Sequence, residues 1–505
     1  MYRARDSKLG GPNCFRNRRS VSSNLPLSRH TKGGIKGKTM KKDSTGGAIS
    51  RRQMLRGATA AGVVLPLAQM FPAHNAYAQG QGLLPEFRAT LPVFSVAERD
   101  RRWAAVRAIM ARPQWNLDAI ITVGSDRWGN NARYLTQVAL VRYAQPGPQV
   151  LFPRDPAKTV HVQISATRHV NSWNDRLGPG GWLADGKMAL QAETGGEALA
   201  KLLAEEGFDR RGTRIGVAKL KGTRFEPEGL VSATLLDTLR SSLPGVAFVP
   251  IEQWGPDAGP IDEVALAKSP EEQEVIRRSV AINEQGLAAA IAAARNGATR
   301  QADLWWAAFT TMFADAGEDF IRLSIGLDEG GNSNIGEPVG DAVRRGQICT
   351  QEISAAFQGY GCQINHSFFI GSPSTPGYDY YRAAIDVLLK VHEKAMAFIE
   401  PGKTTYGEFE ENTRQSFADL NEQGGGLGVH SGGIGQCRVR SRPGEDQKIV
   451  MQPGHSFDFK PSVSLRRAGM AGAGKRVQLG ESILVTEEGA VRYGSRSMGP
   501  ITTHT

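Results

Sequence analysis

Cysteine is scarce in this 505-residue chain, which contains only Cys14, Cys349, Cys362 and Cys437. No two of them have CxxC spacing, and the chain beyond residue 78 retains three, an odd number. Disulfide frameworks are built from even sets of cysteines at regular spacings. We therefore expect no disulfide framework and interpret the three as small buried apolar residues.

A long hydrophobic run is also missing. The apolar stretch Gly57–Phe71 contains Pro66, and a membrane-spanning helix needs about 20 apolar residues. The stretch follows the arginine pair Arg51-Arg52 and precedes the small-residue pattern Ala76-Tyr77-Ala78. That order is typical of a cleavable secretory signal of the twin-arginine type. We expect passage through the twin-arginine translocase, a periplasmic protein that begins near residue 79, and no stable membrane insertion.

An excess of positive charge is absent outside this presequence. The chain has 61 Lys+Arg and 50 Asp+Glu, but residues 1–78 hold fifteen of the basic and two of the acidic residues. The remainder has a net charge of about −2, which excludes a general nucleic-acid-binding surface. Residues 1–39 are polar and lack hydrophobic periodicity, and Met40 is a better signal-peptide start. They are either an over-extended gene start or a disordered basic tail, and both readings exclude them from the fold.

Residues 79–262 are predicted to form an α/β domain. The segment 95–110 has the periodicity of an amphipathic helix, and 119–123 is a short β-branched run typical of a buried strand. Further strand-like and helix-like segments alternate up to residue 251. Alternation of this kind predicts helices packed on a central sheet.

Residues 263–505 are predicted to form a second domain. Ser269, Pro270 and Glu272 together predict a helix start, because serine caps, proline suits the first turn and Glu272 completes a capping box. The helix should end at Asn296-Gly297. Two more helices are expected over 301–316 and 380–399, with strands around 348–369 and a glycine- and strand-rich tail from residue 424.

Two nucleotide-binding motifs are only approximated. Gly469–Arg476 places Arg476 where a phosphate loop needs Ser or Thr for magnesium, so we reject it. The stretch Gly424–Gly435 does not spell G-x-G-x-x-G. It does surround His430 with small residues, which lets the backbone approach a ligand closely.

Several short motifs follow one another in the second domain. They are Lys268–Glu272, Gly346–Glu352 with Gly359-Tyr360, Pro401-Gly402, His430 with Gly433, Gln452-Pro453-Gly454 and Gly480–Gly489. Their order resembles the creatinase, prolidase and aminopeptidase P family. The resemblance implies an α/β N-terminal domain followed by an α+β "pita-bread" C-terminal domain, and a homodimer.

The family's metal-dependent members hold two metal ions with two Asp, one His and two Glu. When the motifs are followed in order, this chain resembles those members in having a histidine, His430, at the His position. Glu352 and Gln363 stand at the two Asp positions. Lys460 and Gly480 stand at the Glu positions, with Glu481 adjacent. Hard divalent cations want anionic oxygens or neutral imidazole, and an ammonium group repels them. We therefore expect no metal and no other cofactor.

Creatinase is the family's metal-free branch, and resemblance to it implies roles for the remaining polar residues. His430 would move protons, with His366 as second candidate. Glu352 and Gln363 would orient substrate or water, and Lys460 would stabilise negative charge or act as base or nucleophile. The other implied substrate-binding residues are Asn334 (or Ile335) in place of a missing histidine, Arg438 and Arg440 as a carboxylate clamp, Glu481, and Arg142 reaching into a neighbouring subunit.

Structural readings compete with these roles. His430 could be a hydrogen-bonded structural histidine and Glu352 a paired core carboxylate. We expect Lys460 to face Glu352 within about 4 Å as a substitute for the lost cation, in a pair that is either functional or purely structural.

Three functions stay open at this point. The first is an exported, metal-independent enzyme that hydrolyses or eliminates across a C–N bond of a small carboxylate-bearing substrate. The second is a periplasmic ligand-binding protein that has lost catalysis. The third is an Xaa-Pro dipeptidase or aminopeptidase with an altered metal site.

Overall fold

The computed structural model describes residues 94–123, 131–138, 148–165, 167–221, 228–252, 258–316, 322–328, 336–425, 428–432 and 445–504. The presequence and four predicted ligand-contacting residues, Arg142, Asn334, Arg438 and Arg440, lie outside these ranges. Within them, no helix combines the length and the apolar character that crossing a membrane requires.

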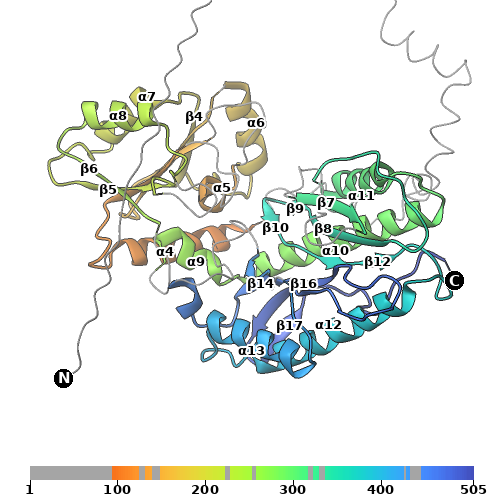
Figure 1. Cartoon of the computed structure of the whole chain (residues 1–505). Helices are drawn as coiled ribbons and strands as arrows, with labels where there is room; N and C mark the ends of the chain where they lie inside the picture. Colours follow the sequence, from red (N-terminus) through yellow and green to blue (C-terminus); the bar gives the residue numbers. More distant parts are fainter. Residues whose placement is uncertain are drawn as a thin grey trace, which may run out of the picture. The chain divides into compact units, whose positions relative to one another are not determined.

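The N-terminal domain is built on a mixed sheet with the strand order β4-β3-β2-β1-β5-β6 among the described residues. β1 pairs in parallel with β5 and antiparallel to β2. The strands are β1 (Ala119–Thr122), β2 (Gln149–Pro153), β3 (Val160–Gln163), β4 (Met188–Gln191), β5 (Arg214–Ala218) and β6 (Ala247–Pro250). The helices are α4 (Val96–Met110), α5 (Asn131–Thr136), α6 (Thr167–Leu177), α7 (Gly196–Glu205) and α8 (Ala233–Ser242), shown in Figure 1.

After α9 (Pro260–Leu266), helix α10 (Pro270–Arg295) begins where the sequence predicted. The Ser269 hydroxyl accepts the Glu272 amide at 3.2 Å, and the Glu272 carboxylate accepts the Ser269 amide at 2.9 Å, which confirms the capping box. The helix ends at Asn296, before Gly297 with φ +90°. The first long helix of the C-terminal domain is therefore set by its own local signals.

Short sheets and long helices make up the C-terminal domain (Figure 1). One sheet has the order β12-β8-β7, and another β11-β16-β14-β13, with β15 and β17 also paired to β16. The strands are β7 (Arg322–Leu327), β8 (Ile348–Ser354), β9 (Ala356–Phe357), β10 (Tyr360–Gly361), β11 (Asn365–His366), β12 (Phe368–Phe369), β13 (His430–Ser431), β14 (Ser456–Phe459), β15 (Ser462–Val463), β16 (Val477–Thr486) and β17 (Gly489–Arg492). The helical elements after α10 are α11 (Gln301–Ala316), α12 (Tyr378–Phe398), α13 (Tyr406–Asp419) and the short 3₁₀ helix η1 (Glu445–Lys448).

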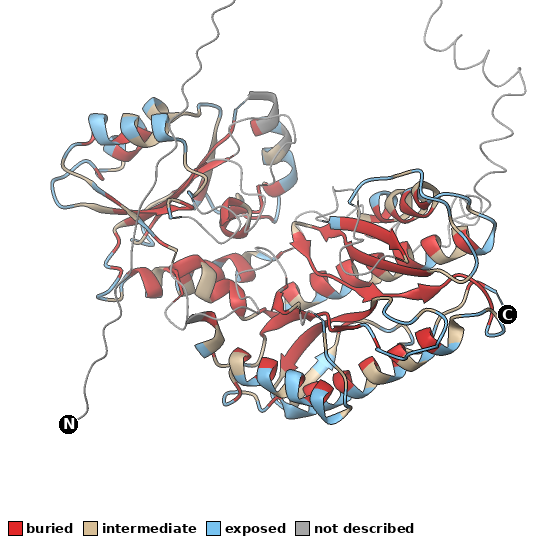
Figure 2. Ribbon diagram, in the orientation of Figure 1, coloured by how far each residue is buried: buried red, intermediate tan, exposed pale blue. Residues whose placement is uncertain are grey.

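Burial separates the two kinds of element in this domain. Strands β7, β8, β14 and β16 are buried along almost their whole length, whereas α12 and α13 keep an exposed outer face (Figure 2). Leu388 on α12 and Phe409 on α13 belong to the same buried cluster as Phe457 and Phe459 on β14. The predicted fold class, an α/β domain followed by a pita-bread domain, is confirmed.

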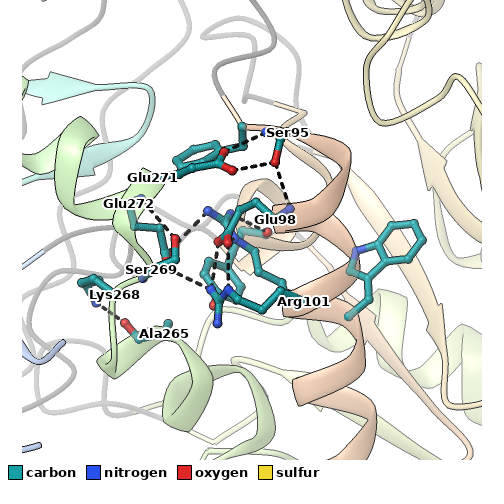
Figure 3. Close-up of polar contacts among 12 residues, drawn as sticks. Ser95, Glu98, Arg101, Ala265, Lys268, Ser269, Glu271 and Glu272 are labelled. Carbon is teal, nitrogen blue, oxygen red and sulfur yellow. Dashed lines mark hydrogen bonds and ion pairs between the residues drawn. The ribbon is translucent and has the colours of Figure 1, made fainter. Parts of the chain in front are cut away.

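A buried ionic network joins α4 to the start of α10, and we call it the interdomain network (Figure 3). Its centre is Arg102, which lies 2.6 Å from Glu98 and 3.6 Å from Glu272. The Tyr360 hydroxyl donates to Glu272 at 2.7 Å, and Arg101 reaches both carboxylates from the surface side. Burial alone lowers the pKa of Arg102, but its neighbours, Glu272 and Glu98 among them, reverse this and raise it.

Candidate functional site

Strand β14 presents two chemically different faces. Phe457 and Phe459 pack their rings 5.5 and 5.1 Å from that of Phe409 on α13. Because side chains alternate along a strand, Asp458 and the following Lys460 project from the opposite face. The register pairs His430 and Ser482 with Asp458, and so brings polar groups of β13 and β16 beside it.

Asp458 is fully buried and holds His430. One carboxylate oxygen lies 3.3 Å from His430 Nδ1. The other accepts hydrogen bonds from the Ser482 hydroxyl at 2.6 Å and from the backbone N–H of Gln363 at 2.9 Å. A carboxylate on one ring nitrogen fixes the tautomer and the orientation of a histidine. The sequence analysis missed Asp458, although the alternation Phe457-Asp458-Phe459-Lys460 marks it as a partner of Lys460 on one strand face.

The side-chain oxygen of Gln363 is the meeting point of two donors. His430 Nε2 lies 3.1 Å from Gln363 Oε1, and the Lys460 ammonium donates to the same atom. The Lys460 ammonium can only donate, because it has no lone pair. The side-chain amide of Gln363 must therefore turn its oxygen, and not its NH2 group, toward Lys460. His430 Nε2 then faces an acceptor as well and must carry a proton to bond there. With Asp458 at Nδ1, the geometry favours a ring that donates from both nitrogens.

Two glycines make room for the stem of Lys460. A Cβ on Gly480 would lie 2.9 Å from Lys460 Cγ and 2.8 Å from Asn365 Oδ1. A Cβ on Gly428, which has φ +54°, would lie 3.1 Å from both Cβ and Cε of Lys460. Real Cβ atoms do not approach other atoms this closely without a shift. The absence of a side chain at Gly480 is thus sterically linked to the presence of Lys460.

Glu352 on β8 completes the group. Its carboxylate lies 3.9 Å from the Lys460 ammonium and 2.6 Å from the Arg322 guanidinium at the start of β7. Arg322, whose side chain is 47% exposed, was not foreseen, because only the β7–β8 pairing brings it near. The shorter distance makes Arg322 the main partner of Glu352. We call Glu352, Lys460, Gln363, His430 and Asp458 the central cluster.

His366 lies in a different environment. Its Nε2 donates to the Gly499 carbonyl at 2.9 Å, and its Nδ1 accepts from Arg496 Nε at 3.3 Å. Burial, followed by the charge of Arg496, lowers the pKa of His366 to about 3. Both ring nitrogens are therefore engaged and the ring is held neutral, away from the central cluster.

Glu481 also faces away from that cluster. It pairs with Phe459 across the strands and so lies on the face opposite Lys460. There it forms ion pairs with Arg496 and, at 3.2 Å, with Arg492. Burial raises the pKa of Glu481, while the two arginines act against that rise. The geometry therefore gives Glu481 the surroundings of a core ion pair.

The residues present bear on whether the site could hold the two metal ions that the resemblance implies. In the described part of the chain, no three His, Cys, Asp or Glu side chains are grouped so that they could hold a metal ion. His430 and Glu352 are separated by an amide and an ammonium that bond to each other. Hard cations need several anionic oxygens, and an ammonium placed among them opposes binding. This donor set does not fit a dinuclear site.

Comparison with known proteins agrees with the fold. Residues 274–487 match the model of metallopeptidase family M24. No curated protein matches the sequence.

Solved structures match at low identity. An Xaa-Pro dipeptidase from Bacillus anthracis is 15% identical, with a TM-score of 0.60, over 80% of this chain and 99% of that one. The dipeptidase PepE from Mycobacterium ulcerans is 17% identical, with a TM-score of 0.60, over 82% and 100%. The N-terminal domain of the FACT complex subunit SPT16 from Cicer arietinum is 14% identical, with a TM-score of 0.58, over 81% and 98%. At these identities the likeness concerns the fold alone.

Proposed function

We propose that the protein is a metal-independent enzyme of the M24 fold that breaks a C–N bond in a small carboxylate-bearing substrate, by hydrolysis or elimination. One observation carries the proposal. Two buried donors, His430 and Lys460, converge on a single oxygen, the side-chain oxygen of Gln363. Convergent donors in a water-poor site are what a reaction that develops charge on oxygen requires.

The geometry assigns a role to each residue. His430, held by Asp458 at Nδ1, donates through Nε2 to a substrate oxygen, and in hydrolysis the entering water supplies both the oxygen that bonds to carbon and the proton that leaves on the nitrogen. Lys460 stabilises negative charge on the substrate oxygen. Glu352 keeps the ammonium in place, 3.9 Å away, and Gln363 supplies the oxygen that both donors meet before substrate arrives. No step is routed through a metal, because the donor set does not fit one.

The second candidate is ligand binding without catalysis. The polar heads of the central cluster are already bonded to one another, an arrangement that a binding site can keep after its chemistry is lost. One solved structure of the same fold is named as a subunit of the FACT complex and not as a peptidase. This candidate predicts that a small carboxylate raises the melting temperature without being converted.

Metal analysis and a substrate panel test the proposal together. The full chain, purified and dialysed, should contain no stoichiometric manganese, zinc or iron, and should not cleave Xaa-Pro dipeptides with added Mn²⁺. It should convert a member of a panel of small amidino, guanidino and N-acyl carboxylates, and His430→Ala should abolish that turnover. Stoichiometric metal bound at Glu352 and His430 would contradict the proposal of a metal-independent enzyme. Ligand-induced stabilisation without turnover would favour the second candidate.

We also propose that the protein is exported to the periplasm through the twin-arginine translocase and acts there as a homodimer. The sequence pattern at Arg51-Arg52 supports export, and the family resemblance supports the dimer. Replacing both arginines with lysine should retain the precursor in the cytoplasm. Size-exclusion chromatography with light scattering should give the mass of a dimer.

A further inference from the structure

The Gln363 side chain occupies a position that suits a ligand oxygen. His430 Nε2 and the Lys460 ammonium point at one amide oxygen, and Gln363, His430 and Lys460 are only 3%, 6% and 7% exposed. We propose that Gln363 is an internal cap whose side-chain oxygen is displaced by a carboxylate oxygen of the ligand. This inference rests on the proposed function: it states how the central cluster opens and that a carboxylate enters it.

The backbone of Gln363 is fixed while its side chain can turn. The backbone N–H of Gln363 donates to the Asp458 carboxylate at 2.9 Å, and its backbone carbonyl accepts the Ser482 hydroxyl at 3.1 Å. Glutamine has several rotatable side-chain bonds, so its terminal amide can leave by rotamer changes. The backbone contacts with the Asp458 and Ser482 side chains stay intact during such a movement. The cap is therefore a side-chain element and needs no domain motion.

The two donors hold their direction without the cap. Asp458 anchors His430 through Nδ1, and Gly428 and Gly480 enclose the Lys460 stem. When the amide oxygen leaves, both N–H groups stay aimed at the same point. A buried donor without an acceptor costs free energy, so a replacement oxygen is required.

A carboxylate is the better occupant of that point. Hydrogen bonds in which one partner is ionised are shorter and about twice as strong as neutral ones, and a carboxylate adds its own charge to the bonds from His430 and Lys460. A neutral amide oxygen facing two donors is thus a weak stand-in for an anion. The capped state competes with the ligand. The apparent Kd therefore equals the Kd of the open site divided by the fraction of molecules in which the cap is open.

Acetate titration of the full chain tests the cap. The parent, Gln363→Ala, Gln363→Glu and the double variant Gln363→Ala/Lys460→Met are compared through melting temperature against acetate concentration. Acetamide and chloride at equal concentration serve as controls. Gln363→Ala should bind acetate at least about tenfold more tightly than the parent, because the competing cap is gone. Gln363→Glu, which supplies its own carboxylate, should not respond, and the double variant should lose the gain.

Where Gln363→Ala does not fold, Gln363→Ser replaces it in all comparisons. Equal acetate affinity in the parent and the truncated variant would overturn the proposal. So would a gain that survives Lys460→Met, or one that acetamide reproduces. None of these readouts depends on turnover, so tight acetate binding by a catalytically inert protein would support the cap and remove the enzymatic proposal.

Discussion

The molecule contains two buried ionic groups that use their charges differently. In the interdomain network, the Arg102 cation meets carboxylates directly, and the rings of Phe94 and Tyr134 lie 4.2 and 4.6 Å from its guanidinium. In the central cluster, the His430 ring and the Lys460 ammonium point at a neutral amide oxygen. The first group pairs its central cation with two carboxylates, whereas the second directs two donors at one side-chain amide oxygen.

The contrast separates a structural role from a functional one. Buried charges that are fully matched fix geometry and are costly to break. Donors that converge on a weak acceptor are less well satisfied and gain from an anion. We therefore place binding chemistry in the central cluster and assign the interdomain network to holding α4 against α10.

Removing Arg102 should have the largest effect. Arg102→Met leaves Glu98 and Glu272 buried without their central partner, and we expect a loss of about 3–5 kcal/mol in the free energy of unfolding, measured by urea titration. Arg101→Met, on the same helix and facing the same carboxylates from a 40% exposed position, should cost less than about 1 kcal/mol. Similar losses for the two variants would contradict the structural role of the buried arginine.

Filling the space beside Lys460 should have the next effect. Gly480→Ala forces Asn365 and Lys460 apart, and overpacking of this kind costs about 1–3 kcal/mol. Gly340→Ala, where a Cβ would meet no atom within 4 Å, is the matched control and should be close to neutral. If Gly480→Ala is as well tolerated as the control, the steric link between Gly480 and Lys460 is wrong.

Lys460→Met should destabilise less than Arg102→Met. The sequence alone suggested a buried pair with Glu352, and removing one partner of such a pair would cost as much as in any buried ion pair. Arg322 at 2.6 Å keeps Glu352 partnered, so we expect a loss of about 1–2 kcal/mol in the free energy of unfolding. Adding Arg322→Met should produce a loss greater than the sum of the single variants. Simple additivity in that cycle would show that Arg322 does not compensate.

Acid should distinguish His366 from a solvent-exposed histidine. Its folded-state pKa is about 3, so between pH 6.5 and 3 the unfolded chain binds more protons than the folded one. Stability is therefore lost as the pH falls through that window, by about 1.4 kcal/mol per pH unit from this group. His366→Gln should reduce the slope of unfolding free energy against pH by that amount. An unchanged slope would mean that the ring protonates freely in the folded protein.

Local signals predicted some elements and missed others for identifiable reasons. The capping box at Ser269 and Glu272 lies within four residues and needs no tertiary information, and the structure confirms it. An equivalent box at Thr405 and Glu408 begins α13, a helix that the sequence analysis did not predict.

The composition of the central cluster was only partly predictable. Glu352, Gln363, His430 and Lys460 follow from the order of motifs along the chain, and the structure brings them together. Asp458 lies in none of the motifs that carry the resemblance, and Arg322 meets Glu352 only through strand pairing. Likewise, the approach of Gly428 and Gly480 to one lysine depends on strand register, which no single segment encodes.

The central claim is that His430 donates from both ring nitrogens to Asp458 and Gln363. Nitrogen-15 NMR of histidine-labelled protein at pH 7, assigned with His430→Gln and His366→Gln variants, tests it directly. We predict that His430 carries protons on both nitrogens, whereas His366 carries one, on Nε2. A neutral His430 with a single protonated nitrogen would contradict the account, because only one of the two contacts could then be a hydrogen bond from the ring.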